Sequence, residues 1–159
     1  MIQQIILVLI FIGFQGTTYG TNTWRTNQRF YMTDRLSCSC KYKQTDGFEI
    51  CCNWRKEFRL AEIDSAGKSR EVREFLFRNE YGTAWIAGRP GACPFRDYVW
   101  GKDGGKPMNY TNWRKTPAPG DINEAEWCDL GVIVRDSPPA KWDLVRQDTL
   151  HHVLCELSN

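Results

Sequence analysis

The chain has 159 residues, which fits one domain and leaves little room for a second. Its formal net charge of +2 is too weak to indicate a nucleic-acid partner. Seven cysteines are many for this length, and a 13% aromatic content that includes seven tryptophans indicates a core built on large rings, or a surface that presents some of them.

An almost unbroken apolar run occupies residues 5–14. It is too short to cross a bilayer as a helix, which takes roughly 20 apolar residues, and it fits the central region of a secretory leader. Small residues at Thr18 and Gly20 predict cleavage after Gly20, so residues 1–20 are expected to be a signal peptide and the remaining chain to be secreted. No second long apolar run follows, so we expect no membrane span.

Residues 21–45 are polar and show no regular periodicity, which predicts an irregular N-terminal extension. It contains Cys38 and Cys40. In an exported chain, cysteines indicate disulfides before metal ligands. We therefore expect a disulfide to tie the extension to the domain that follows.

Two helices are predicted next. The first runs from about residue 47 to residue 58 with Asp46 as its cap, because apolar side chains recur there at helical spacing. A short strand at residues 60–63 follows, and a second helix is expected over residues 69–79 with Ser69 as its cap.

The character of the sequence then changes. A short strand at residues 84–87 leads into residues 88–124, which are rich in Gly, Pro, Asp and Asn and predict a long loop. Such a loop inside a compact domain is usually functional. Strand-like runs follow at residues 127–134, 141–145 and 152–157, so the order of elements predicts an α+β fold.

Taken together, the motifs resemble the C-type lectin-like domain family. The resemblance spans about residues 48–157 and rests on the order and spacing of several short motifs. In chain order these are Leu60-Ala61-Glu62-Ile63, Trp85-Ile86-Ala87-Gly88, Trp100-Gly101-Lys102-Asp103-Gly104, Tyr110-Thr111-Asn112-Trp113, Glu126-Trp127-Cys128, Trp142-Asp143 and Cys155-Glu156-Leu157. It implies a C-type lectin-like domain over residues 46–159, with two helices, small antiparallel sheets and a long loop.

The resemblance also implies a disulfide between the first helix and the last strand. The spacing to Leu60 favours Cys52 as the partner of Cys155, whereas helical periodicity places Cys51 on the apolar face. We expect Cys52–Cys155, with Cys51 paired to Cys38 or Cys40.

A second family disulfide is altered. The position where the family has a partner for Cys128 holds Gln147, and Cys93 is the expected substitute. Since seven is an odd number, one thiol stays free or joins two chains in a disulfide-linked dimer.

The residues that bind calcium and sugar in the family are only partly present. The resemblance places the proline of the family's binding tripeptide at Pro119, whose neighbours Ala118 and Gly120 carry no side-chain oxygen, and puts Leu144 in place of a ligand aspartate. Calcium takes six to eight oxygens, so we expect no calcium and no other cofactor. The candidate ligand residues, which would hold calcium only if the loop rebuilt the site, are Asp121, Asn123, Glu126 and Asp143.

The resemblance implies a secreted recognition protein that binds glycans or glycoproteins, as in immunity or host interaction. The aromatic side chains of the loop region are candidates either for stacking on sugar rings or for the core, and the resemblance implies core positions for the two tryptophans; they are Tyr98, Trp100, Tyr110 and Trp113. The alternative is a toxin-like or protein-binding module that uses the fold as a scaffold. No arrangement typical of an enzyme is present. Asn109 opens a glycosylation sequon, and His151 and His152 point to opposite faces of a strand and so do not suggest a metal site.

Overall fold

A computed structural model describes residues 24–26, 29–33, 42–91, 97–102, 105–117, 123–135, 137 and 140–158. The predicted signal peptide, Cys38, Cys40, Cys93 and Asp121 lie outside these residues. The helices are α1 (Gln44–Trp54) and α2 (Ala66–Arg78), with a 3-10 helix η1 (Glu124–Asp129). The strands are β1 (Trp24–Thr26), β2 (Phe30–Thr33), β3 (Phe58–Leu60), β4 (Thr83–Trp85), β5 (Gly88–Pro90), β6 (Tyr98–Trp100), β7 (Leu130–Arg135), β8 (Trp142–Arg146) and β9 (His152–Leu157).

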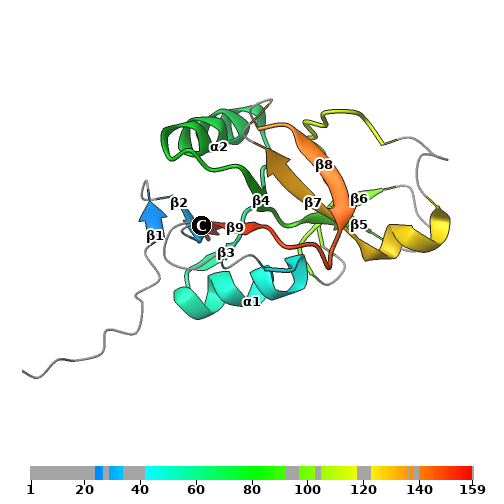
Figure 1. The fold of residues 1–159 in the computed structure, drawn as a ribbon, viewed down its shortest axis with the longest axis horizontal. Coiled ribbons are helices and arrows are strands. Elements are labelled where there is room, and N and C mark those ends of the chain that lie inside the picture. The colour runs from blue at the N-terminus through cyan, green and yellow to red at the C-terminus, as the bar shows by residue number, and fades with distance from the viewer. Residues whose placement is uncertain are drawn as a thin grey trace, which may run out of the picture.

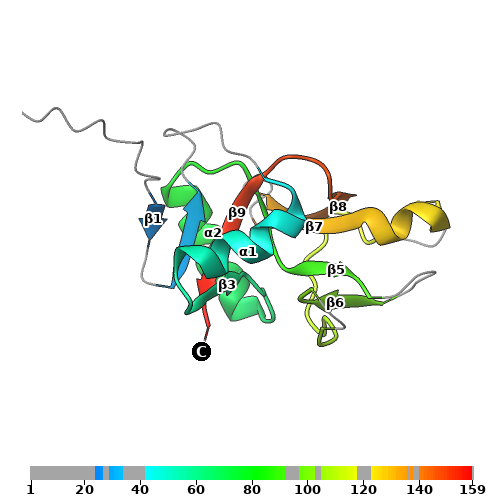
Figure 2. The ribbon, with the colours of Figure 1, turned by 90° about the horizontal axis from the view of Figure 1, so that it is seen from below.

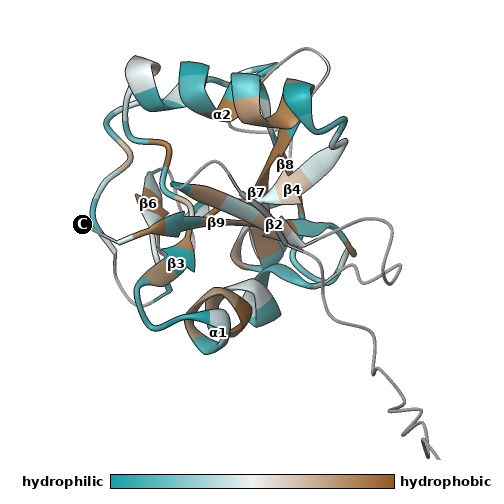
Figure 3. Cartoon of the chain, turned by 90° about the vertical axis from the view of Figure 1, so that its left-hand side faces the viewer, coloured by the Kyte–Doolittle hydropathy of each residue, from teal (hydrophilic) through white to brown (hydrophobic). Residues whose placement is uncertain are grey.

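One mixed sheet forms the centre of the molecule. Its strands follow the order β1-β2-β9-β4-β7-β8, and β3 also pairs with β9. The pairing of β4 with β9 is parallel and the others are antiparallel. Helices α1 and α2 lie on opposite sides of this sheet (Figures 1 and 3). This is the expected α+β architecture with two helices, and no described helix is long and apolar enough to cross a membrane.

A second, two-stranded sheet carries the loop region. It consists of β5 and β6, which pair antiparallel from Gly88 opposite Trp100 to Pro90 opposite Tyr98. Together with η1, this sheet lies at the end of the molecule away from β1 and β2 (Figure 2). The segment predicted as one long loop therefore contains two short strands.

The core is aromatic, as the composition indicated. Trp85 and Trp142 are fully buried and Trp100 almost so. The ring of Trp142 makes edge-to-face contacts with Trp100, Tyr110 and Trp113, at centroid distances of 5.6, 5.8 and 5.6 Å. Such pairs add stability beyond the burial of apolar area, so this cluster fixes the loop region to β8.

The disulfide that joins α1 to β9 uses Cys51. Cys51 and Cys155 are bonded and fully buried, whereas Cys52 is exposed and free. The predicted pairing Cys52–Cys155 is therefore wrong, and so is the predicted pairing of Cys51 with Cys38 or Cys40. The physical reason is the register of α1, because adjacent residues on a helix face different directions and the buried face carries Cys51. Cys128 is also disulfide-bonded, and its expected partner lies outside the described residues.

The segment before α1 is more regular than its composition suggested. Residues 30–33 form β2, which pairs with β9 from Phe30 opposite Glu156 to Met32 opposite Leu154. Phe30 and Met32 are fully buried. The expectation of an irregular extension is thus wrong for this stretch, since its alternate side chains complete the core.

Helix ends also differ from the predictions. Helix α1 begins at Gln44 after Lys43, which has no side-chain cap hydrogen bond, so Asp46 lies in the first turn and is not the cap. The cap of α2 is Ser65, whose Oγ accepts from the backbone N–H of Lys68 at 3.2 Å. Ser69 is buried within the helix. The first three residues of the strand predicted at residues 127–134 belong to η1, and the rest lie in β7.

Candidate functional site

Asp143, one of the four predicted ligand residues, lies near the start of β8. Its side chain is only 12% exposed, and both carboxylate oxygens are engaged by arginines. Arg114 donates from Nε to Oδ1 at 3.0 Å, and Arg135 donates from Nε to Oδ2. The carboxylate thus lies between two guanidinium groups.

Backbone pairing places both arginines beside Asp143. Residues 112–114 run parallel to the start of β8: the backbone N–H of Trp142 donates to the carbonyl of Asn112 at 3.0 Å, and that of Arg114 donates to the carbonyl of Trp142 at 2.9 Å. Arg135 ends β7, the antiparallel neighbour of β8, where its N–H donates to the carbonyl of Lys141 at 2.8 Å. Two segments on either side of β8 therefore each contribute one arginine.

Asn112 and Lys141 brace the same region. The side-chain amide of Asn112 donates to the carbonyl of Ala140 at 2.9 Å, and its Oδ1 accepts from Nζ of Lys141 at 2.8 Å. Lys141 is half-buried. It adds a third positive charge within the group Arg114, Arg135, Lys141 and Asp143, which we call the arginine cluster.

The other predicted calcium ligands do not join Asp143. Glu126 is exposed in η1, and its charge interacts electrostatically with Arg146, which lies at the end of β8 opposite to Asp143. Asn123 is exposed just before η1, and Asp121 lies outside the described residues. Among the residues that the structure describes, no three His, Cys, Asp or Glu side chains gather closely enough to hold a metal ion.

These contacts provide a test of whether the described residues fit calcium. Calcium binds through oxygens, and both oxygens of Asp143 are already paired with cations. A divalent cation at this place would meet two guanidinium charges at close range, and like charges repel. The residues described at this place therefore do not fit the ion that the family resemblance implies.

Aromatic side chains of the loop region divide into buried and half-buried groups. Trp100 is 1% exposed and belongs to the core, whereas Tyr98, Tyr110 and Trp113 are half-buried. The Tyr98 ring lies 4.9 Å from that of Trp113 and 6.0 Å from that of Trp127. Burial raises the pKa of Tyr98 to about 12, and its buried hydroxyl has no hydrogen-bond partner among the described residues.

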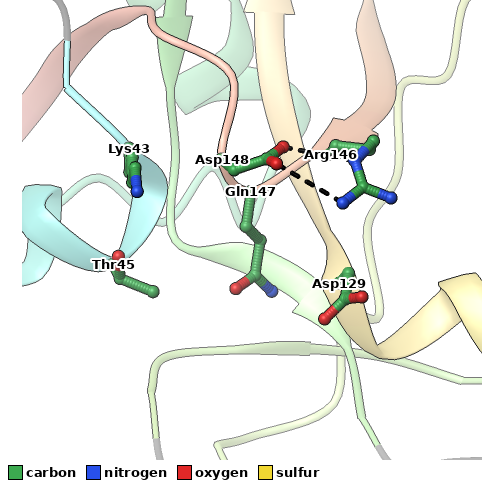
Figure 4. Close-up of a pocket in the computed structure, with 6 residues that line it drawn as sticks. All are labelled: Lys43, Thr45, Asp129, Arg146, Gln147 and Asp148. Carbon is green, nitrogen blue, oxygen red and sulfur yellow. Dashed lines mark hydrogen bonds and ion pairs between the residues drawn. The ribbon is translucent and has the colours of Figure 1, made fainter.

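A polar cavity of about 260 Å³ lies at the other end of β8, away from Asp143. The residues that line it come from α1 and the residue before it, from the end of η1, from the end of β8 and from the turn that follows β8 (Figure 4). They are Lys43, Thr45, Asp129, Arg146, Gln147 and Asp148. Two of its charged side chains pair with each other, because Arg146 donates to Asp148 at 3.3 Å through both Nε and an Nη. That hydrogen bond raises the pKa of Arg146, with smaller contributions from the charges of Asp129 and Glu126. It also lowers the pKa of Asp148, with a smaller contribution from the charge of Lys43.

Gln147 has a structural part in this cavity. It stands where the resemblance would place a second cysteine for Cys128. Its side-chain Nε2 donates to the carbonyl of Leu130 at 2.8 Å, and its backbone N–H donates to the carbonyl of Asp129 at 2.7 Å. Hydrogen bonds thus tie the end of β8 to the start of β7, where the family has a covalent link.

The glycosylation sequon and the two histidines lie in different surroundings. Asn109 is exposed, as is Thr111, so the sequon is accessible. His152 is buried and contacts the Thr33 hydroxyl, while His151 is half-buried beside the Thr83 hydroxyl at 2.9 Å. The two histidines therefore have separate surroundings.

Known proteins show which fold this arrangement represents. No protein-family model matches the sequence, and no curated protein matches it. The carbohydrate-recognition domain of mouse scavenger receptor C-type lectin is similar in structure, with a TM-score of 0.60 and 17% identity over 86% of this chain and 95% of that one. The chain has the C-type lectin-like fold.

Two further solved structures of this fold show how varied its members are. The C-type lectin CEL-I from Cucumaria echinata aligns with a TM-score of 0.60 and 17% identity over 85% of this chain and 94% of that one. A calcium-independent type II antifreeze protein aligns with a TM-score of 0.60 and 19% identity over 85% of this chain and 91% of that one. The C-type lectin-like fold is therefore found both in sugar-binding lectins and in a protein that works without calcium.

Sequence reasoning found Asp143 but missed Arg114 and Arg135. The three positions are separated by 29 and 8 residues, so no local motif connects them. The only available signal was the replacement of the family's ligands around Asp143 by residues without oxygens. That signal indicated the loss of calcium, but it did not predict that arginines would pair with Asp143.

Proposed function

We propose that this chain is a secreted C-type lectin-like recognition protein that binds glycans or glycoproteins without calcium. The observation that carries the proposal is the pairing of Asp143 with Arg114 and Arg135, at the place where the resemblance expects calcium. The C-type lectin-like fold supplies the binding role, because its relatives are lectin-like binding domains. A calcium-independent protein with the same fold supports the lack of a metal.

Secretion is part of this proposal. A buried disulfide joins α1 to β9 across 104 positions of sequence, and such bonds persist in oxidising, extracellular environments. The apolar leader at residues 5–14 and the exposed sequon at Asn109 agree with export. Expression of the full sequence in eukaryotic cells, followed by mass spectrometry of the medium, tests the cleavage after Gly20 and glycosylation together.

A glycan array tests the function. The secreted, oxidised protein is applied in calcium and again in chelator, and the proposal expects the same glycans to be bound in both. Glu126→Gln serves as a control variant, because it removes a family-type ligand and should leave binding unchanged. Binding lost in chelator or in this variant would refute calcium independence, as would calorimetric binding of calcium tighter than about 1 mM, the weak end for extracellular modules.

A protein-binding or toxin-like module is the second candidate. The exposed, free thiol of Cys52 on α1 favours it, because it allows two chains to be joined covalently. A dimer on a non-reducing gel that disappears in Cys52→Ser, together with an array on which no glycan is bound, would favour this candidate over the first.

A further inference from the structure

The two arginines that hold Asp143 keep most of their hydrogen-bond donors available. Both use Nε toward the carboxylate. A guanidinium carries several more N–H donors on its two Nη atoms. Within the described part of the chain, neither Arg114 nor Arg135 donates from an Nη to another residue. With respect to the described residues, the outer edges of both guanidiniums are therefore free to bind a ligand.

Exposure and charge favour an anionic ligand. The side chains of Arg114 and Arg135 are 55% and 32% exposed, whereas Asp143 is 12% exposed. Lys141 contributes a third cation, whose Nζ contacts an amide oxygen of Asn112 and no described carboxylate. The arginine cluster thus has three positive charges and one negative charge, and the negative charge is less exposed than either guanidinium.

Asp143 also fixes the geometry of the arginines. Because their Nε atoms bind the two oxygens of one carboxylate, the guanidiniums are neighbours and each loses rotational freedom before a ligand arrives. Ordering long side chains in advance lowers the entropic cost of binding. Guanidinium forks match carboxylate and sulfate-like oxyanions in a bidentate geometry, which an ammonium group does not.

We propose that the arginine cluster binds the sulfate or carboxylate group of an acidic glycan. The inference rests on the proposed function and names the class of glycan. Two arginines oriented by one carboxylate take the place of the metal ion as the group that fixes the ligand. The site recognises the charge of the ligand and does not need the paired sugar hydroxyls that a calcium site binds.

Calorimetry with three oligosaccharides of equal length tests the proposal, at about 0.15 M salt so that distant charges are screened. The first is a sulfated heparin-type hexasaccharide, the second is the same chain without its sulfates, and the third is neutral. We expect the sulfated form to bind. The neutral form should bind with an affinity at least about tenfold lower, which is the loss of affinity expected for one charged hydrogen bond. Binding of the desulfated form at the level of the sulfated form would assign recognition to the carboxylates.

Three double variants separate the arginine cluster from general electrostatics. Arg114→Gln with Arg135→Gln removes both charges, and Arg114→Lys with Arg135→Lys keeps them without the forked donors. Lys56→Gln with Arg73→Gln is the matched control. Both residues are exposed, and this double variant removes two positive charges outside the arginine cluster. For the sulfated hexasaccharide we expect losses of about tenfold or more, about threefold or more and less than about twofold respectively. Urea unfolding of each variant shows whether it is folded. If the glutamine pair is unstable, the lysine pair still tests the proposal, because it keeps the positive charges beside Asp143.

Equal losses in the control and the glutamine pair, or full affinity in the lysine pair, would overturn the proposal in favour of unspecific charge attraction. Binding to neutral glycans that all variants retain, without affinity for the sulfated chain, would overturn this inference while leaving the proposed function intact. No binding to any glycan would overturn both.

Discussion

Gly131 in β7 and Gln44 at the start of α1 are predicted to be strongly coupled. The side chain of Gln44 is 1% exposed, and its Nε2 donates to the carbonyls of Ile86 and Gly88 at 2.7 and 2.8 Å. These hydrogen bonds hold the chain where β4 leads into β5. A Cβ atom added at Gly131 would lie 2.2 Å from Oε1 and 2.5 Å from Cδ of Gln44. Gly131→Ala must therefore displace the amide.

The cost follows from the hydrogen bonds that are lost. Two buried carbonyls lose their donor, and each such loss costs about 1–3 kcal/mol. Replacing a strand glycine by alanine by itself raises the free energy of unfolding by roughly 0.5–1 kcal/mol. We expect Gly131→Ala to lower the free energy of unfolding by about 1–5 kcal/mol. Gly82→Ala is the matched control, because nothing lies within 4 Å of its added Cβ; its effect should stay within about 0.5 kcal/mol.

A double-mutant cycle measured by urea unfolding gives the decisive result. Gln44→Ala alone loses the same two hydrogen bonds and should cost a similar amount. In that background the alanine at position 131 has no amide to displace, so it should cost less than about 1 kcal/mol, which gives a coupling of roughly 2 kcal/mol or more. Costs of the two changes that add to within about 0.5 kcal/mol would refute the assignment of Gly131 as the residue that makes room for Gln44.

Two further predictions concern a disulfide and a buried phenol. Cys51→Ser should lower the free energy of unfolding by about 4–5 kcal/mol, the chain-entropy value for a loop of this size, whereas Cys52→Ser should have little effect; the reverse result in urea unfolding would restore the pairing that the resemblance implied. Burial raises the pKa of Tyr98 to about 12 from an ordinary 10.0, so the unfolded chain releases this proton first and stability falls as the pH rises from about 10 to about 12. At about pH 11 this amounts to roughly 1 kcal/mol after solvent screening. The test is made in a Cys52→Ser background, which avoids thiol exchange. There, Tyr98→Phe should remove this loss of stability at alkaline pH and leave the stability at neutral pH unchanged or higher. An equal alkaline loss with Tyr98 and with phenylalanine at this position would contradict the burial of the hydroxyl.

The order of elements could be predicted from the sequence because each carries a local signal. Period and motif located both helices, and the last strand was placed with its observed bounds, 152–157. The pairing of Cys51 was also present in the helical period of α1, which disagreed with the spacing taken from the family. The local physical signal was correct in that disagreement, because burial of one helix face is decided by this chain's own apolar residues.

Features that depend on distant partners could not be predicted. Residues 30–33 show no strong pattern alone, and they become a strand because β9 offers an unpaired edge. Gln44 is polar and was placed outside the domain, yet the structure buries it because two carbonyls 42 and 44 positions away accept its amide. In both cases the decisive interaction joins segments that sequence windows never compare.

In the function that we propose, the arginine cluster lets this fold keep a binding surface without calcium. A carboxylate that is 12% exposed, such as Asp143, needs a nearby positive charge, since a buried unpaired charge is costly. The resemblance places Asp143 where the family has an uncharged asparagine that helps to hold calcium, and here Arg114 and Arg135 supply the positive charge from within the chain. The exchange changes what the site offers: a bound metal provides open coordination positions for hydroxyls, whereas the arginines provide donors for an anion. The loss of the metal ligands and the gain of an anion site are then two consequences of the same replacement.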